Sequence, residues 1–420
     1  MKTFYSILFI LQAGIVSMAR AQAGGSAAVP FLTIQPSPRA NGMGGTSAAY
    51  TGNDPLAIAF NPAQLGHMSL DQAFALELYP SSTSWLPQLT SNLSFDAKTV
   101  LLGYPFKGLN RKKPFSFGLA YTRVSLDFGE SVITGEDGPE PIGTFHAFER
   151  ANLWSLGAGV DDLVEAGLGL TLKDIQSNLA PEVTAGGGSA SAIAYDFGAV
   201  AYVPADEIVA RVKKAPIEIG PGLRPFGGIG FGYSQSNIGD KISYIDASQA
   251  DPLPRTARIG TSLKIGLALH AHDQTWQLLS FEHVHEAEQS LVRFDGSGEV
   301  SYDGWLGDID FWNNVILRKG GAEITSKNGG EFGLAEIVAI RYGHHDDPVG
   351  NLIYDTKGIG FSLHGVLKMI RHFNPGSRSE PWLDFMYKHL DVGFNASRLN
   401  AKEGHPVTGT EFQSIRISIF

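Results

Sequence analysis

Two short clusters of histidines and carboxylates contain the residue types that bind metals or transfer protons. One is Glu282-His283-x-His285-Glu286, and the other is His344-His345-Asp346-Asp347. On a β-strand, His283 and His285 share a face and form a feasible pair of metal ligands. A metal site also needs a third ligand and groups that orient the first ones, and the spacing supplies neither. We therefore predict no metal site, and we interpret the second cluster as a solvated loop.

Sequence signatures of hydrolytic enzymes are missing from the chain. It contains no Gly-x-Ser-x-Gly elbow and no His-Glu-x-x-His pair. The glycine-rich stretch from Gly227 to Gly232 superficially resembles a nucleotide-binding loop. It lies in a strand-like run without a following helix, where glycines more often ease curvature or close packing. We interpret the isolated histidines His270 and His364 as polar residues of a lumen, and we predict no catalytic residues, no cofactor and no enzymatic activity.

The composition favours many strands joined by tight turns. Charged residues make up only 18% of the chain, aromatic residues make up 10%, and glycine occupies 50 of the 420 positions. The net charge of −10 argues against nucleic acid as a partner, because phosphate contacts need clustered Lys and Arg. There is no cysteine, so thiol nucleophiles, Cys-ligated zinc and disulfides are all excluded.

The first residues have the features of an export signal. Lys2 supplies a positive charge, residues 4–16 are almost continuously apolar, and Ala19-Arg20-Ala21 fits the small-x-small cleavage rule. The apolar run is shorter than the roughly 20 residues that cross a bilayer, which disfavours an N-terminal anchor. We assign residues 1–21 to a signal peptide. The mature chain is then either a soluble periplasmic protein or a β-barrel.

Alternation of apolar and polar residues predicts strands of a length that spans a membrane. In residues 258–269, Ile259, Leu263 and Ile265 fall on one face, and Arg258 and Lys264 fall on the other. A similar alternation recurs in four shorter segments, at 115–121, 166–173, 358–364 and 414–419. Further strands are expected at 74–79, 93–106, 152–160, 192–203, 224–234, 276–283, 295–302, 337–343 and 384–395. The total of about 14 is the kind of even number that a closed antiparallel barrel prefers.

Two features favour a membrane barrel over a soluble β-sandwich or propeller, which also alternates. The polar faces consist of Gly, Ser, Thr and scattered charges, which suits a wet or plugged lumen. Aromatic residues near strand ends suit an interfacial girdle: Tyr104, Phe106, Phe128, Trp154 and Tyr202. We predict an all-β fold, a transmembrane antiparallel β-barrel of about 14 strands formed by residues 71–420, with outer-membrane lipid as a partner. Short helices are expected at 205–214 and within 305–327, on connecting loops.

Residues 22–70 do not have the pattern of a membrane strand. They contain five prolines and a glycine cluster at Gly42, Gly44 and Gly45. Their many apolar residues, among them Phe31 and Tyr50, are unusual for a solvated linker. We predict that this segment folds as a hatch, or plug, inside the barrel. Its glycines would allow the backbone to turn close to the wall.

The chain resembles a known family at these residues. Arg39-Ala40-Asn41-Gly42-Met43-Gly44-Gly45, followed by Asn61-Pro62-Ala63, is similar to the opening of the PorV/PorQ group of outer-membrane proteins. That group belongs to the superfamily of the long-chain fatty acid transporter FadL. Residues 85–89, 333–343 and 347–361 strengthen the resemblance, whereas residues 204–221 and 286–327 fall outside it. The hatch residues implied by the resemblance are Arg39, Gly42, Met43, Gly44, Gly45, Asn61, Pro62 and Ala63.

The resemblance implies a 14-stranded barrel whose lumen is filled by the hatch, and it leaves two functions open. PorV serves type IX protein secretion, so the first hypothesis is a non-enzymatic scaffold or shuttle that contacts secreted cargo or subunits of the secretion machinery. FadL-type proteins pass hydrophobic molecules through the barrel wall, so the alternative is a transporter of hydrophobic small molecules. In either case the protein is expected in the outer membrane.

Overall fold

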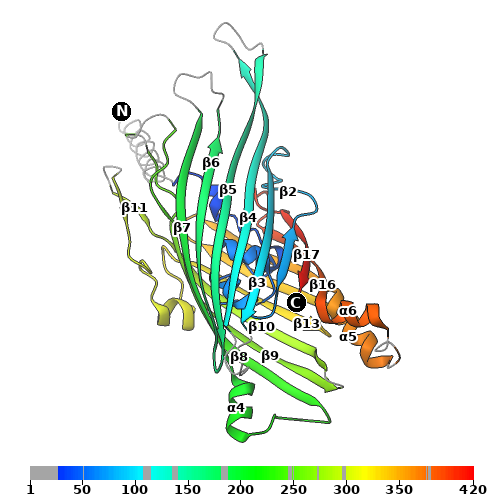
Figure 1. Ribbon diagram of the computed structural model, residues 1–420. Helices are drawn as coiled ribbons and strands as arrows, with labels where there is room; N and C mark the ends of the chain where they lie inside the picture. Colours follow the sequence, from blue (N-terminus) through cyan, green and yellow to red (C-terminus); the bar gives the residue numbers. More distant parts are fainter. Residues whose placement is uncertain are drawn as a thin grey trace.

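The chain folds into one antiparallel sheet that closes on itself (Figure 1). The computed structural model describes residues 27–50, 52–106, 115–134, 141–180, 188–244, 248, 250–271, 274–295, 299–374, 376 and 380–420. Strand β1 (Phe74–Leu78) closes the sheet, because it pairs with both β3 (Ser94–Phe106) and β17 (Glu411–Ile419). The result is a barrel of 14 strands, as the sequence predicts.

Eleven further strands complete the barrel, each paired with its neighbours. They are β4 (Phe115–Thr134), β5 (Pro141–Asp161), β6 (Glu165–Asn178), β7 (Ser189–Pro204), β8 (Leu223–Gly239), β9 (Thr256–Ala271), β10 (Gln274–Ser290), β13 (Thr325–Leu334), β14 (Val338–Asp347), β15 (Leu352–Ser362) and β16 (Leu390–Ala401). The two-residue strand β2 (Thr83–Ser84) extends the edge of β3.

Three details of the strand prediction are wrong, and the first two cancel in the count of strands. The strand expected at 295–302 is not a wall strand in the described residues of that range, because β12 (Val300–Tyr302) pairs only with β11 (Val292–Phe294). Strand β13 takes the missing place in the wall. The expected strand at 384–395 begins only at Leu390, because α6 (Pro381–His389) precedes it.

The outer surface of the barrel carries a belt of exposed apolar side chains. It includes Leu102 on β3, Leu156 on β5 and Leu170 on β6, each more than half exposed. Such a belt is the surface that lipid covers in a membrane barrel. Tyr104, Phe106 and Trp154 face outward, as expected for a girdle. Two other expected girdle residues do not. Tyr202 is buried on the inner face, and Phe128 packs against the interior cluster near the upper end.

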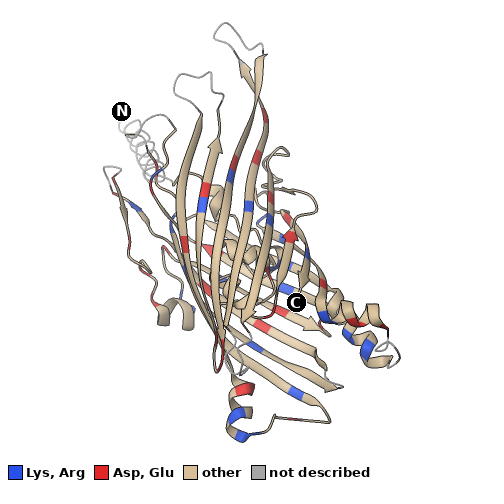
Figure 2. Ribbon diagram, viewed as in Figure 1, with Lys and Arg blue, Asp and Glu red and all other residues tan. Residues whose placement is uncertain are grey.

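The two ends of the barrel carry different connections. We call the lower end the one where β1 begins and β17 ends. In the described part of the chain it holds three helices: α4 (Ala205–Lys213), which the sequence predicts, α5 (Leu363–Phe373) and α6. In Figure 2, acidic residues mark the start of α4 and basic residues its free end.

Among the described residues, no helix is long and apolar enough to cross a membrane.

A long connection between β10 and β13, which we call the flap (residues 291–324), lies against the outside of the barrel (Figure 1). It contains β11, β12 and the π-helical turn η5 (Phe311–Ile316), which occupies part of the range 305–327 where a short helix is expected. Its Ile309 and Val315 pack against Ala287 of β10. The Tyr233 hydroxyl on β8 donates a hydrogen bond to the Trp305 carbonyl (2.6 Å). The flap therefore covers part of the outer surface of β8–β10.

Candidate functional site

The segment between residue 29 and β1 fills the lumen as a series of short helical turns. These are η2 (Pro30–Thr33), α2 (Pro38–Gly42), η3 (Pro55–Ala59) and α3 (Ala63–Met68). A proline stands at the start of each turn, where its missing N–H costs nothing and its fixed φ favours a helix. The prolines that prevent this segment from forming a wall strand therefore begin its helical turns inside the lumen. We call residues 29–72 the hatch.

Lumen-facing glycines on the wall strands let the hatch backbone approach closely. A Cβ on Gly198 of β7 would lie 2.0 Å from Oδ1 of Asn61, and one on Gly169 of β6 would lie 2.1 Å from the Pro62 carbonyl oxygen. A Cβ on Gly343 of β14 would lie 2.1 Å from the Gly44 nitrogen. These distances are too short for any side chain. The many glycines of the strands therefore serve close packing of wall and hatch.

The triplet Asn61-Pro62-Ala63 forms a fixed turn at the wall. The Asn61 Oδ1 accepts a hydrogen bond from the Ala63 N–H (3.1 Å), and its Nδ2 donates one to the Ala48 carbonyl (2.7 Å). One side chain thus satisfies two backbone groups that are buried from water. The structure places all the hatch residues suggested by the resemblance inside the barrel. Their functional role stays a prediction.

The glycine cluster makes its own contacts on the opposite side of the lumen. Gly44 and Gly45 have φ values of +75° and +80°, which favour glycine. The Thr356 hydroxyl of β15 accepts a hydrogen bond from the Gly44 N–H and donates one to the Gly42 carbonyl, each 3.0 Å long. Met43, between these glycines, is fully buried. The Thr356 hydroxyl thus joins this part of the hatch to β15 by two hydrogen bonds.

Charged wall residues hold the hatch at two further points. Arg39 forms a two-pronged ion pair with Glu331 of β13, with N–O distances of 2.6 and 2.8 Å. Glu331 also accepts a hydrogen bond from Arg341 of β14 (2.6 Å). Glu286 of β10 accepts hydrogen bonds from two hatch amides, those of residues 47 and 48, each at 2.7 Å. Arg39 belongs to the hatch motif and Glu286 to the first histidine cluster, so both stand out in the sequence. Nothing in the sequence marks Glu331 as the partner of Arg39.

The hatch separates two cavities of the lumen. The upper cavity has a volume of about 320 Å³ and the lower one about 460 Å³. Arg39 of α2 lines the lower cavity, whereas Asn41 of the same turn lines the upper one. A single five-residue helical turn therefore stands between them.

The two cavities differ in chemistry. The upper one has an apolar wall that includes Phe60 of the hatch, Trp85 of the β2–β3 connection and Phe412 of β17. The rings of Trp85 and Phe412 lie 6.1 Å apart. Its charged residues are Lys327, whose ammonium lies 2.7 Å from Glu288, and two further carboxylates, those of Glu323 and Asp347. The lower cavity is lined mainly by charged and polar groups: Arg39, His67, Asp71, Lys264, Glu282, Glu331, Glu336, Arg341, Lys368 and Arg416.

Strand alternation separates the residues of the two histidine clusters. Glu282 and Glu286 face the lumen, whereas His285 faces outward, where its Nε2 lies 2.9 Å from the Asn314 carbonyl oxygen of the flap. His345 lines the upper cavity and stacks on Tyr354 with ring centroids 4.5 Å apart. This second cluster belongs to β14, so its interpretation as a loop is wrong. Within the described part of the chain, no group of three or more such residues could hold a metal ion.

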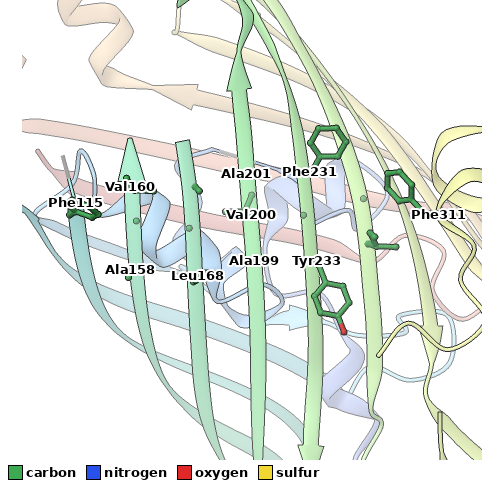
Figure 3. A pocket seen from close by; sticks show the side chains of 16 residues that line it. Phe115, Ala158, Val160, Leu168, Ala199, Val200, Ala201, Phe231, Tyr233 and Phe311 are labelled. Atoms are coloured by element: carbon green, nitrogen blue, oxygen red, sulfur yellow. The ribbon is translucent and has the colours of Figure 1, made fainter. Parts of the chain in front are cut away.

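A third hollow lies on the outside of the wall (Figure 3). We call it the outer groove; its volume is about 550 Å³. Its lining is almost wholly apolar and includes Ala199 and Ala201 of β7. Figure 3 shows Phe115 of β4 at one side and Phe311 of the flap at the other.

Comparison with known proteins finds similar barrels among solved structures. The Ralstonia pickettii toluene transporter TbuX is 14% identical, with a TM-score of 0.38, over 91% of this chain and 97% of that one. The Pseudomonas putida toluene transporter TodX is 11% identical (TM-score 0.35; 95% and 97% covered), as is a Pseudomonas aeruginosa FadL homologue (TM-score 0.34; 91% and 97% covered). No family model and no curated protein matches the chain. Similarity this low assigns neither a family nor a function.

Proposed function

We propose that the protein is a non-enzymatic outer-membrane channel for hydrophobic small molecules, which bind first in the upper cavity and pass when the hatch moves. The observation that carries this proposal is an apolar-walled cavity above the hatch, which at α2 is separated from the lower cavity by one helical turn. Its volume of about 320 Å³ suits a small ligand. Its apolar wall suits a ligand with an apolar body and at most a small polar group.

Two further features support the channel over a purely structural barrel. The hatch is attached to the wall by discrete polar contacts, such as those of Arg39 and Thr356, which can be exchanged one by one. The lower cavity on the other side of α2 supplies space into which the hatch can shift. Export across the inner membrane would require the signal peptide, which lies outside the described residues.

Ligand binding tests the proposal through Trp85. We expect the purified barrel to bind dodecanoic acid or toluene, the two probes, and Trp85→Ala to raise the Kd about 5- to 30-fold, because truncating a buried aromatic contact typically costs ~1–2 kcal/mol. The matched control is Trp382→Ala on α6, an exposed tryptophan remote from the cavity. Titration by calorimetry measures both. Equal affinities for wild type and Trp85→Ala, or no binding of either probe, would contradict the proposal.

The secretion-associated scaffold implied by the PorV/PorQ resemblance stays a prediction. No contact among the described residues favours a cargo site over a small-molecule site. Its test is independent of ligand binding. If the scaffold hypothesis holds, deleting the gene abolishes surface display of other exported proteins, and intact display removes it.

A further inference from the structure

The outer groove is a recess in the surface that faces lipid. Leu168 of β6 and Phe231 of β8, which line it, are 57% and 41% exposed and belong to the apolar belt. Between them, Ala199 and Ala201 of β7 present only methyl groups. The large side chains on both sides thus stand above a floor of small ones. The groove is continuous with the belt, so hydrocarbon is the medium that fills it.

The flap adds a side wall to the outer groove. Phe311 of η5 bounds it on one side (Figure 3). The position of η5 is fixed, because its Val315 packs on Ala287 and its Asn314 carbonyl lies against His285. Next to it, the Trp305 carbonyl accepts the hydrogen bond of Tyr233, which also lines the groove. An apolar chain in the groove would therefore contact protein on two sides.

Charged residues of both signs lie where the groove reaches the lower end of the barrel: Asp161, Asp162 and Glu165 at its edge, and three basic residues towards the free end of α4. Val160 lines the groove two residues before Asp162, and the Arg211 guanidinium of α4 donates hydrogen bonds to the backbone and carboxylate of Asp162. Arg211 also lies 4.0 Å from Glu207. Beyond Arg211, the exposed Lys213 and Lys214 end the helix. Figure 2 shows this basic end of α4 below the wall strands.

We propose that the outer groove and the basic end of α4 form a binding site for one anionic glycerophospholipid. An acyl chain lies along β7 in the groove, and the phosphate lies near Lys213 and Lys214. Each half matches one part of the lipid: a methyl-lined recess fits a flexible hydrocarbon chain, and ammonium groups attract a phosphodiester. The site lies outside the lumen, so it goes beyond the channel function and does not depend on it.

Native mass spectrometry of the whole barrel tests the site, with phosphatidylglycerol and phosphatidylcholine as the added lipids. We expect one retained phosphatidylglycerol per barrel and about tenfold less phosphatidylcholine. The variant Ala199→Phe fills the groove and should lower phosphatidylglycerol retention about tenfold. The double variant Lys213→Gln/Lys214→Gln should remove the preference between the two lipids. The matched control is Ala396→Phe, at a half-buried position on β16 away from the groove.

Each result has a defined meaning. Equal retention in wild type, Ala199→Phe and Ala396→Phe would overturn the groove as the acyl-chain site. A lipid preference that survives the double variant would overturn α4 as the headgroup site. A second protein chain bound to this surface, displaced by Ala199→Phe, would overturn a lipid as the occupant. Heat-modifiable migration on a denaturing gel verifies that each variant is a folded barrel, so a loss of lipid cannot arise from misfolding.

Discussion

Glu331 is the residue on which the attachment of α2 to the wall depends. It receives hydrogen bonds from two guanidinium groups, those of Arg39 and Arg341, and all three residues are largely buried. Two cations this close require the carboxylate between them, because a buried charge without a partner is strongly unfavourable. The Arg39 guanidinium also lies over the Tyr50 ring, 4.4 Å from its centroid. Tyr50 thus connects this ion pair to the next part of the hatch.

The variant Glu331→Gln is expected to lower the free energy of unfolding by about 3–5 kcal/mol, because it leaves two buried arginines without their anion. Chemical denaturation in detergent, followed by migration of unheated samples, measures the change. The control is Glu411→Gln, which removes the partner of Arg398 in an exposed ion pair of 3.3 Å. Such pairs contribute about 0–1 kcal/mol. Similar losses in both variants would show that Glu331 does not hold the hatch.

Gly198 permits a contact that no other residue type allows. In Gly198→Ala, the new methyl group would meet Oδ1 of Asn61 at 2.0 Å and push the Asn61-Pro62-Ala63 turn off the wall. Overpacking of this kind costs about 1–3 kcal/mol. We expect faster proteolysis within the hatch. Gly143→Ala on β5, whose new Cβ would have its nearest contact at 3.5 Å, is the control and should leave the cleavage rate unchanged.

Sequence patterns at the residue scale predict which face a side chain takes but not its partner. Strand alternation correctly places His283 and His285 on one face. The ion pair between Arg39 and Glu331 joins residues far apart in the chain and arises only from the register of β13. Wall glycines such as Gly198 and Gly169 are indistinguishable in the sequence from turn glycines until the path of the hatch is known.

At the scale of elements, the channel proposal requires the hatch to move relative to the wall. Asn53 of the hatch and Ser418 of β17 have side-chain atoms 3.4 Å apart, and the natural chain has no cysteine. We expect oxidised Asn53→Cys/Ser418→Cys to lose uptake of labelled dodecanoic acid, and reductant to restore it. The two single variants are the controls. Full uptake with a disulfide verified by mass spectrometry would mean that the path does not need this movement.

Elements with strong alternation, such as β9, are predictable, whereas two segments near the flap are not. Strand β13 has few large apolar residues, because its inner positions are Lys327, Gly329 and Glu331, which serve the hatch and the lumen. The sequence of residues 295–302 alternates enough to resemble a strand, yet Val300–Tyr302 form β12 of a hairpin outside the wall. Polar and glycine residues that serve the hatch thus weaken the apolar alternation of β13, which is a wall strand. The β11–β12 hairpin has a similar alternation although it lies outside the wall.

At the scale of the whole molecule, the apolar belt defines which part of the wall lies in the membrane. Strands β4 and β5, at 20 and 21 residues, are about twice the length that spans a bilayer. On these strands the continuous belt lies in the lower part, and Val132 and Ile142 are isolated exposed apolar residues near the upper ends. The interior above the belt contains the cluster that includes Phe95 and Phe412. The barrel therefore extends well above the bilayer. The upper cavity belongs to this projecting part, where a ligand can enter from water.

This placement predicts a depth-dependent cost of charge on the outer face. Leu170 lies in the belt, flanked by Leu168 and Leu172, so Leu170→Arg should lower the free energy of unfolding in lipid vesicles by about 2–4 kcal/mol. Ser191 faces outward near the upper end of β7, above the belt, so Ser191→Arg should cost only about 0–1 kcal/mol. Denaturant titrations followed by tryptophan fluorescence measure both. Equal costs would mean that the bilayer also covers the upper wall, and the upper cavity would then lie at the depth of the membrane rather than above it.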